Sequence, residues 1–304
     1  MLRHTVGIDL GSNTLRAVKR DCEAGEFVAE YEKIVRTADG LAWSGQISEA
    51  AVERVLAALG EAQERLGFEG VRLRAVTTEA LRRAANREEV LARIERESGI
   101  RFEVIDGEEE ARLTLLAVEK RLERLGRETE RFVLADIGGG STELIFRRPG
   151  ETVSRSFPLG IVTLSQEAEG SLERVAELLE AKLEPLRAFV REQRERGGET
   201  GSFVATAGTP TTVAAMKLGM EYAGYDSRRI NGTRLERSEL FLHLERLLAM
   251  DKTARERAVG VGREDLIAAG ILIFEGIFRV LEAEECVVID DGLREGVALA
   301  LCGR

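Results

Sequence analysis

Three consecutive glycines followed by two hydroxyl side chains form the most chemically informative stretch of the sequence. A turn with so few side chains exposes its backbone amides, and successive exposed N–H groups bind anions. Hydroxyl groups add hydrogen-bond donors at the same place. The natural anion is a phosphate. We therefore expect a phosphate-binding loop made of Gly138, Gly139, Gly140, Ser141 and Thr142.

Two carboxylates flank this loop. Apolar residues of strand composition lie on both sides of it, so the loop is predicted to close a hairpin that brings Asp136 and Glu143 to its mouth. Two carboxylates placed together repel unless a cation lies between them, and Mg²⁺ is the cation that suits oxygen ligands beside a phosphate. The alternative is a flexible glycine hairpin with two solvated acids, which one short motif does not exclude.

The same pattern occurs a second time, near the N-terminus. Aligning Asp9 with Asp136 superimposes Asp-Leu-Gly-Ser-Asn-Thr on Asp-Ile-Gly-Gly-Gly-Ser. A repeat at this separation suggests two similar domains that each contribute one phosphate loop to a shared cleft, with chance similarity as the alternative. The repeat adds Asp9 to the candidate metal ligands and adds three candidate phosphate contacts, which are Ser12, Asn13 and Thr14.

Two further candidates follow predicted strands. Residues 71–76 read as a strand that runs into a helix carrying Arg82, and residues 203–215 as a strand, the turn Gly208-Thr209 and a helix. Binding residues commonly lie at such strand ends, and a helix N-terminus binds anions. The alternatives are an ordinary strand-to-helix joint and an arginine on a solvated helix face.

Three glutamates open a predicted helix after Asp106. We predict Asp106 as the N-cap and Glu109 as its capping-box partner. The helix dipole favours acidic residues in a first turn, so structure alone explains their presence. Glu108 precedes the box partner, whereas Glu110 follows it and is the glutamate that remains available to face a cleft.

The length of 304 residues exceeds what one hydrophobic core normally supports, so we expect two domains. A charged segment, 121–131, precedes the glycine hairpin, and we place the boundary there, which gives domains 1–125 and 126–304. The terminal helix 293–304 belongs to the second domain or, as the alternative, packs back on the first. Strands that alternate with helices in both halves predict an α/β fold.

Composition excludes several classes of protein. The formal net charge of −10 argues against a general nucleic-acid-binding surface. The longest apolar run, 266–278, is shorter than a membrane span, and no secretory signal opens the chain, so we expect a cytoplasmic protein that does not bind membranes.

Cys22, Cys286 and Cys302 are odd in number and widely spaced, which indicates reduced thiols. With two histidines in the chain, a metal must be held by oxygen.

Together, these motifs resemble the exopolyphosphatase and guanosine pentaphosphate phosphohydrolase (Ppx/GppA) family. Two-loop phosphate binding is shared with sugar kinases, actin and chaperone ATPases, but the glutamate-rich helix start and the ending Asp-Gly-Leu-Arg-Glu-Gly look specific to this family. The chain ends soon after that motif, so it resembles the short members without additional helical domains. The resemblance runs through the chain in order, at 9–14, 78–86, 107–112, 136–144, 208–209, 263–265 and 291–296.

The resemblance implies two ribonuclease-H-like domains facing across a cleft, and Mg²⁺-dependent release of terminal phosphate. It implies that Glu110 is the catalytic glutamate that activates water, and that Asp136 and Glu143 are metal-associated acids. The residues that match the family's phosphate contacts are Ser12, Asn13, Arg82, Gly139, Gly140, Ser141 and Thr142.

Three functions are compatible with these features. We favour an exopolyphosphatase that releases orthophosphate from inorganic polyphosphate, with hydrolysis of guanosine pentaphosphate as an alternative or additional activity. An ATP-dependent kinase on the same scaffold lacks a clear phosphoacceptor site. A non-catalytic sensor of polyphosphate or guanosine tetraphosphate has no need of Glu110, Asp136 and Glu143 together. A homodimer is left open.

Overall fold

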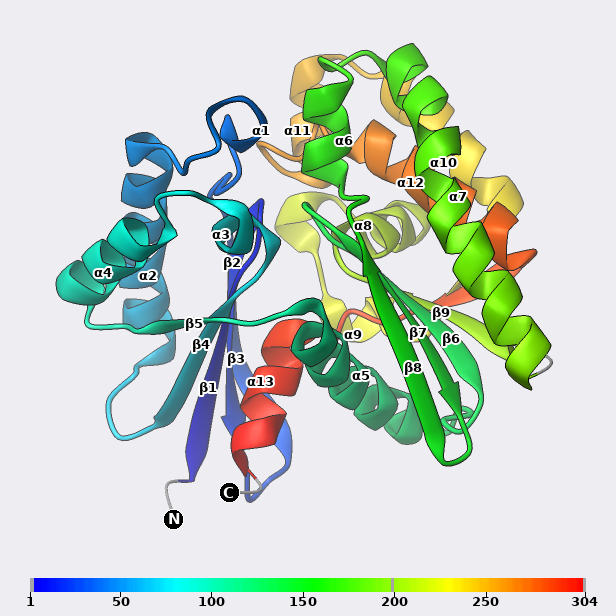
Figure 1. Ribbon diagram of the computed structural model, residues 1–304. Coiled ribbons are helices and arrows are strands. Elements are labelled where there is room, and N and C mark those ends of the chain that lie inside the picture. The colour runs from blue at the N-terminus through cyan, green and yellow to red at the C-terminus, as the bar shows by residue number, and fades with distance from the viewer. Residues whose placement is uncertain (1–2, 198–199, 303–304) are drawn as a thin grey trace. The chain divides into compact units, whose positions relative to one another are not determined.

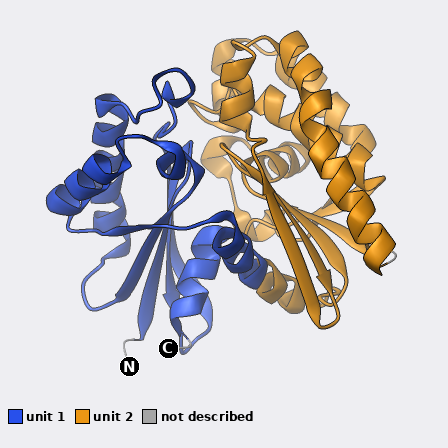
Figure 2. Ribbon diagram, in the orientation of Figure 1, with its two compact units in different colours: residues 1–117, 292–304 blue, residues 118–291 orange. Residues whose placement is uncertain are grey.

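Two mixed β-sheets organise the chain in the computed structural model, which describes residues 3–197 and 200–302 (Figure 1). The chain divides into two compact units, residues 1–117 with 292–304, and residues 118–291 (Figure 2). The first point of division falls within α5 (Gly107–Arg124), and the second precedes α13 (Leu293–Cys302). The predicted α/β class is confirmed, since each sheet is covered by helices.

The sheet of unit 1 has the strand order β3-β2-β1-β4-β5. Strands β1, β2 and β3 are antiparallel neighbours, whereas β4 and β5 continue the sheet parallel to β1. Parallel strands end at the same edge, and the register pairs Leu10 with Thr77 and Thr77 with Val104. The segments after β1, β4 and β5 therefore meet at one edge. The strands are β1 (His4–Leu10), β2 (Thr14–Asp21), β3 (Glu26–Ile34), β4 (Arg72–Thr77) and β5 (Phe102–Val104).

Helices cover this sheet because their apolar residues fall on one stripe. In α2, Ser48 caps the first turn by accepting a hydrogen bond from the Ala51 amide, and Val52, Val55 and Leu59 are buried. The helices of unit 1 besides α5 and α13 are α1 (Leu41–Ser44), α2 (Glu49–Leu66), α3 (Glu79–Arg83) and α4 (Arg87–Ser98).

Helix α13 packs closely on β1 and α5 (Figure 1). A Cβ atom on Gly7 would lie 2.3 Å from the Arg294 carbonyl oxygen, and one on Gly296 would lie 1.9 Å from the Leu113 carbonyl oxygen. Only glycine fits at such distances, so these two positions fix how α13 crosses its neighbours. Helix α13 thus supports the strand that carries Asp9 and the helix that opens with the three glutamates.

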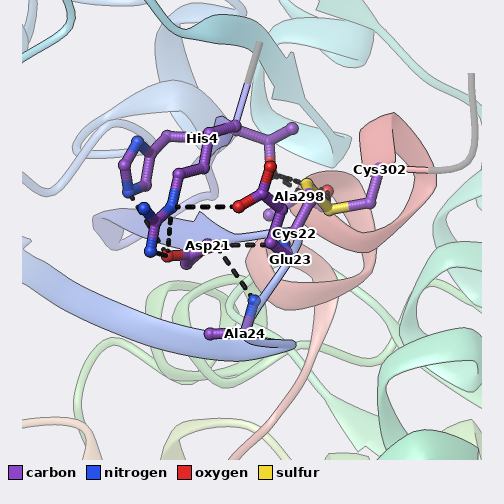
Figure 3. The surroundings of a disulfide bond; sticks show 9 residues. His4, Asp21, Cys22, Glu23, Ala24, Ala298 and Cys302 are labelled. Atoms are coloured by element: carbon purple, nitrogen blue, oxygen red, sulfur yellow. Dashed lines mark hydrogen bonds and ion pairs between the residues drawn. A yellow bond between two sulfur atoms is a disulfide. The ribbon is translucent and has the colours of Figure 1, made fainter. Parts of the chain in front are cut away.

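A disulfide bond between Cys22 and Cys302 joins the β2–β3 hairpin to the end of α13 (Figure 3). The prediction of reduced thiols is wrong for these two cysteines. They are 280 residues apart in sequence and become neighbours, with Cα atoms 5.5 Å apart, because the terminal helix lies against the first sheet. Cys286 is a thiol, and burial raises its pKa.

Breaking this bond is expected to destabilise the protein. A cross-link that closes so long a loop restricts the unfolded chain, and its loss typically costs about 2–4 kcal/mol. We expect Cys22→Ser, Cys302→Ser and the double variant to lower the free energy of unfolding equally in urea titrations, because each change removes the same bond. Additive losses would contradict this expectation, as would three reactive thiols in the denatured, unreduced wild type.

The sheet of unit 2 repeats the topology of the first. Its order is β10-β11-β9-β6-β7-β8, in which β6, β7 and β8 are antiparallel and β9 and β11 lie parallel to β6. The series β8-β7-β6-β9-β11 matches β3-β2-β1-β4-β5, so both units have the predicted ribonuclease-H-like arrangement. The strands are β6 (Phe132–Ile137), β7 (Thr142–Arg148), β8 (Glu151–Phe157), β9 (Ser202–Thr206), β10 (Thr233–Glu236) and β11 (Glu285–Val288).

The core of unit 2 lies between this sheet and its helices. Phe203 of β9 packs edge-on against Phe278 of α12. A Cβ on Gly276 would meet Leu183, so α12 and α7, the two longest helices of the unit, cross closely. Among the described residues, none of the helices combines the length and apolar character needed to span a bilayer. The helices are α6 (Ile161–Glu167), α7 (Leu172–Gly197), α8 (Gly208–Lys217), η1 (Tyr222–Gly224), α9 (Ser227–Ile230), α10 (Arg237–Ala249), α11 (Lys252–Val259) and α12 (Ile267–Leu281).

Candidate active site

The two glycine loops are the same turn. The Gly138 amide donates to the Ser141 carbonyl oxygen at 2.9 Å, and the Gly11 amide donates to the Thr14 carbonyl oxygen at 3.0 Å. These bonds are equivalent when Asp9 is aligned with Asp136. The repeated sequence therefore encodes a repeated backbone conformation, each time between the first two strands of a sheet.

In both loops a carbonyl group accepts a hydrogen bond from the segment that follows the third strand of the sheet. In unit 2 the Val162 amide donates to the Gly139 carbonyl oxygen at 2.8 Å, and in unit 1 the Ala38 amide donates to the Ser12 carbonyl oxygen at 2.8 Å. Within residues 3–197 and 200–302, no hydrogen bond uses the amides of Ser12, Asn13, Gly139 and Gly140. Successive amides without an acceptor form an anion-binding concavity.

Gly160, which the sequence did not single out, supports the loop of unit 2. A Cβ atom on it would lie 2.2 Å from the Gly140 carbonyl carbon and 2.3 Å from the Gly139 carbonyl oxygen. Nothing in the segment Pro158-Leu159-Gly160 distinguishes it from an ordinary turn, because the contact joins residues that are distant in sequence. Any larger residue must displace the loop.

The change Gly160→Ala is expected to lower both stability and phosphate release. Overpacking of this kind typically costs about 1–3 kcal/mol, and the displaced loop would misplace its amides. The matched control is Gly60→Ala in α2, where an added Cβ meets nothing within 4 Å and alanine should stabilise the helix by roughly 0.8–1 kcal/mol. Urea unfolding and phosphate release measure the two effects. A Gly160→Ala protein with unchanged turnover would refute the supporting role.

The hydroxyl groups of the second loop hydrogen-bond within the protein. Ser141 Oγ donates to Glu143 Oε1 at 2.8 Å, and Ser156 Oγ donates to the same oxygen at 2.6 Å. Thr142 Oγ1 donates to the Leu159 carbonyl oxygen at 2.5 Å. These bonds orient the Glu143 carboxylate and fix the start of β7, so the backbone amides are the loop's principal donors toward an anion.

Asp136 and Glu143 are directly opposite each other on β6 and β7, so their side chains share one face of the sheet. Both are buried. Like charges opposite each other are destabilising, and Mg²⁺ is typically bound by one or two carboxylates together with substrate phosphates and water. In the described part of the chain no three His, Cys, Asp or Glu side chains form a metal-binding group. Two opposed carboxylates are the kind of ligand that this mode of Mg²⁺ binding uses. The metal roles of Asp136, Glu143 and Asp9 stay predictions.

The joint between β9 and α8 lies beside Asp136, which is in register with Thr206. Ala207 has φ of 74°, a conformation that side chains rarely adopt, and α8 begins at Gly208. The Thr209 hydroxyl lies against α12, since a Cβ on Gly270 would be 2.2 Å from Thr209 Oγ1. The group at this joint best placed for an anion is therefore the helix N-terminus.

In unit 1, Arg82 and Glu110 come together at the edge where β1, β4 and β5 end. Arg82 follows β4 in α3, and Glu110 lies in the first turn of α5, after β5. Arg82 Nη1 is 3.5 Å from Glu110 Oε2 and donates to the Ile105 carbonyl oxygen at 2.7 Å. Glu110 is largely buried. The loop after β1, with Ser12, belongs to the same edge.

The three glutamates of α5 have different surroundings. Asp106 is the N-cap, as predicted, and accepts from the Glu109 amide at 2.9 Å. The other half of the predicted capping box is wrong, because the Glu109 carboxylate pairs with Arg112 at 2.6 Å and with Arg74 at 3.1 Å. The hydrogen bond from Arg112 holds the pKa of Glu109 below its ordinary range. Glu108 is exposed.

Asp291 of the Asp-Gly-Leu-Arg-Glu-Gly ending makes contacts that connect parts of unit 2. Arg121 donates to both of its carboxylate oxygens at 3.0 Å, and Asn231 Nδ2 lies 3.3 Å from Oδ1. Glu295 accepts from the Gly292 amide at 2.9 Å, which caps α13. The motif thus fixes the chain on both sides of the second point of division.

The predicted residues therefore form two groups. One group in unit 1 contains the loop Ser12–Thr14 with Arg82 and Glu110, and the other in unit 2 contains the loop 138–142 with Asp136 and Glu143. Each group combines backbone N–H groups that can bind a phosphate with at least one carboxylate side chain.

Comparison with known proteins finds similarity along the chain. The model of the Ppx/GppA phosphatase family matches residues 18–304. Exopolyphosphatase 2 of Mycobacterium tuberculosis is 29% identical over 327 residues, covering 99% of each chain. Exopolyphosphatase 1 of Mycobacterium leprae is 30% identical over 308 residues, covering 96% of this chain and 87% of that protein.

Solved structures agree with the fold. The crystal structure of the Aquifex aeolicus member of the Ppx/GppA family has a TM-score of 0.74 at 29% identity, and the match covers 98% of this chain and 97% of that chain. An exopolyphosphatase from Cytophaga hutchinsonii has the same fold, with a TM-score of 0.84 at 23% identity and coverage of 99% and 98%.

Proposed function

This chain belongs to the Ppx/GppA phosphatase family, and we propose that it is a magnesium-dependent exopolyphosphatase that releases terminal orthophosphate from inorganic polyphosphate. The observation that carries the proposal is the pair of equivalent turns whose successive amides have no acceptor among the described residues. Such amides recognise phosphate and make no contact that requires a nucleobase. The names of the similar mycobacterial proteins support the same substrate class.

In the proposed reaction, water attacks the terminal phosphorus atom and the bond from phosphorus to the bridging oxygen breaks. Glu110 orients the water and accepts its proton, which typically contributes about 10²–10⁴ in rate. Loop amides and Arg82 stabilise the charge on the phosphoryl oxygens. Asp136 and Glu143 would hold Mg²⁺, whose positive charge would further neutralise phosphoryl oxygens. Orthophosphate and a polymer shorter by one unit are the products.

The test is phosphate release from polyphosphate, guanosine pentaphosphate and ATP, measured side by side with the same enzyme preparation. We expect the highest kcat/KM for polyphosphate. A much higher value for guanosine pentaphosphate would reverse the ranking of the two substrates and assign the chain to the nucleotide-hydrolysing branch of the family. No release from either substrate would refute the proposed function.

A further inference from the structure

Besides Glu110, a second carboxylate, that of Glu79, contacts the guanidinium of Arg82. Arg82 donates to Glu79 Oε2 through Nε at 3.1 Å and through Nη2 at 2.7 Å. Its third nitrogen, Nη1, donates to the Ile105 carbonyl oxygen at 2.7 Å and lies 3.5 Å from Glu110 Oε2. The guanidinium is therefore held from the start of α3, from the residue that follows β5 and from the first turn of α5.

We propose that Glu79 is a positioning residue for the reaction: it fixes the Arg82 guanidinium so that Nη1 faces Glu110. The inference rests on the proposed function. An arginine side chain has many rotamers, and a charge-assisted bond to two of its nitrogens removes most of that freedom. Glu79 and Arg82 are both partly buried, which protects their ion pair from water.

This role differs from that of a surface ion pair. The nearby Arg83 is about half exposed and lies 3.9 Å from the other Glu79 oxygen, so it adds little. A helix-stabilising role alone would affect folding but not the reaction. A role as a negatively charged barrier to substrate would predict tighter substrate binding once the charge is removed. The positioning role predicts a loss in kcat, because Arg82 acts on charge that develops in the transition state.

The test is a double-mutant cycle on polyphosphate hydrolysis. We expect Glu79→Ala to lower kcat about tenfold with less than about a threefold change in KM, and Glu79→Gln, which keeps an acceptor of the same length, to lose less. In an Arg82→Ala background, Glu79→Ala should change kcat less than about twofold, because the residue on which it acts is absent. Glu88→Ala, an exposed acid at the start of α4, is the matched control and should leave kcat unchanged.

A spectroscopic measurement follows Arg82 without turnover. In the wild type the Arg82 Nε–H should exchange slowly with water, as seen in its ¹⁵N–¹H signal, and Glu79→Ala should make it exchange quickly. Equal losses from Glu79→Ala in both backgrounds would overturn the inference, as would tighter substrate binding with unchanged kcat. Wild-type enzyme that releases no phosphate would overturn the proposed function itself. Thermal unfolding confirms that each variant is folded.

Discussion

Replacing Glu110 with Gln is expected to lower kcat for phosphate release from polyphosphate by at least about a hundredfold. Glutamine keeps the shape and the hydrogen-bonding capacity of the side chain but cannot accept the proton of the attacking water. The largely buried position at the start of α5, 3.5 Å from Arg82 Nη1, places the carboxylate in the predicted group of unit 1. Polyphosphate binding should be unchanged or tighter, because a negative charge is removed.

The matched control is Glu108→Gln, in the same helical turn. Glu108 is exposed, so the change should cost a few tenths of a kcal/mol of helix-dipole stabilisation and leave kcat nearly unchanged. Steady-state kinetics of the two variants, with thermal unfolding as a check on folding, compare them directly. If both variants had the same kcat, or if Glu110→Gln kept wild-type turnover, another residue would have to activate the water.

Chelation of divalent cations is expected to abolish turnover, and added Mg²⁺ is expected to restore it. Asp136 and Glu143 are buried on one face of the sheet, and two hydroxyl groups orient Glu143. Two carboxylates beside a phosphate loop are what Mg²⁺ needs from a protein, since substrate oxygens and water complete its coordination. Phosphate release in excess EDTA, followed by titration with Mg²⁺, measures the requirement.

The variant Asp136→Asn separates this role from general electrostatics. We expect it to raise the Mg²⁺ concentration for half-maximal activity by at least about tenfold, and to weaken Mg²⁺ binding in calorimetry without substrate. Glu245→Gln, an exposed acid on α10, removes the same charge elsewhere in unit 2 and should change neither quantity. Undiminished release in excess EDTA would assign the two acids a different role.

The sequence by itself predicted the parts of the candidate site that depend on near neighbours. The turn after Asp136 is closed by a bond between Gly138 and Ser141, so the residues that close it lie within four positions of one another. Asp136 and Glu143 are opposed because a short loop fixes the register of β6 and β7. Repetition of this turn at Asp9 then predicted two similar units, and their matching strand orders bear out that duplication.

Only the tertiary structure decided which distant residues meet. Cys22 and Cys302 bond because α13 lies on the first sheet, and Gly160 matters because its backbone lies against the loop of unit 2. Glu110 reaches Arg82 because β4 and β5 are parallel and end at one edge. Spacing along the chain does not reveal such contacts, because they depend on the order in which strands join a sheet and on where a helix returns to it.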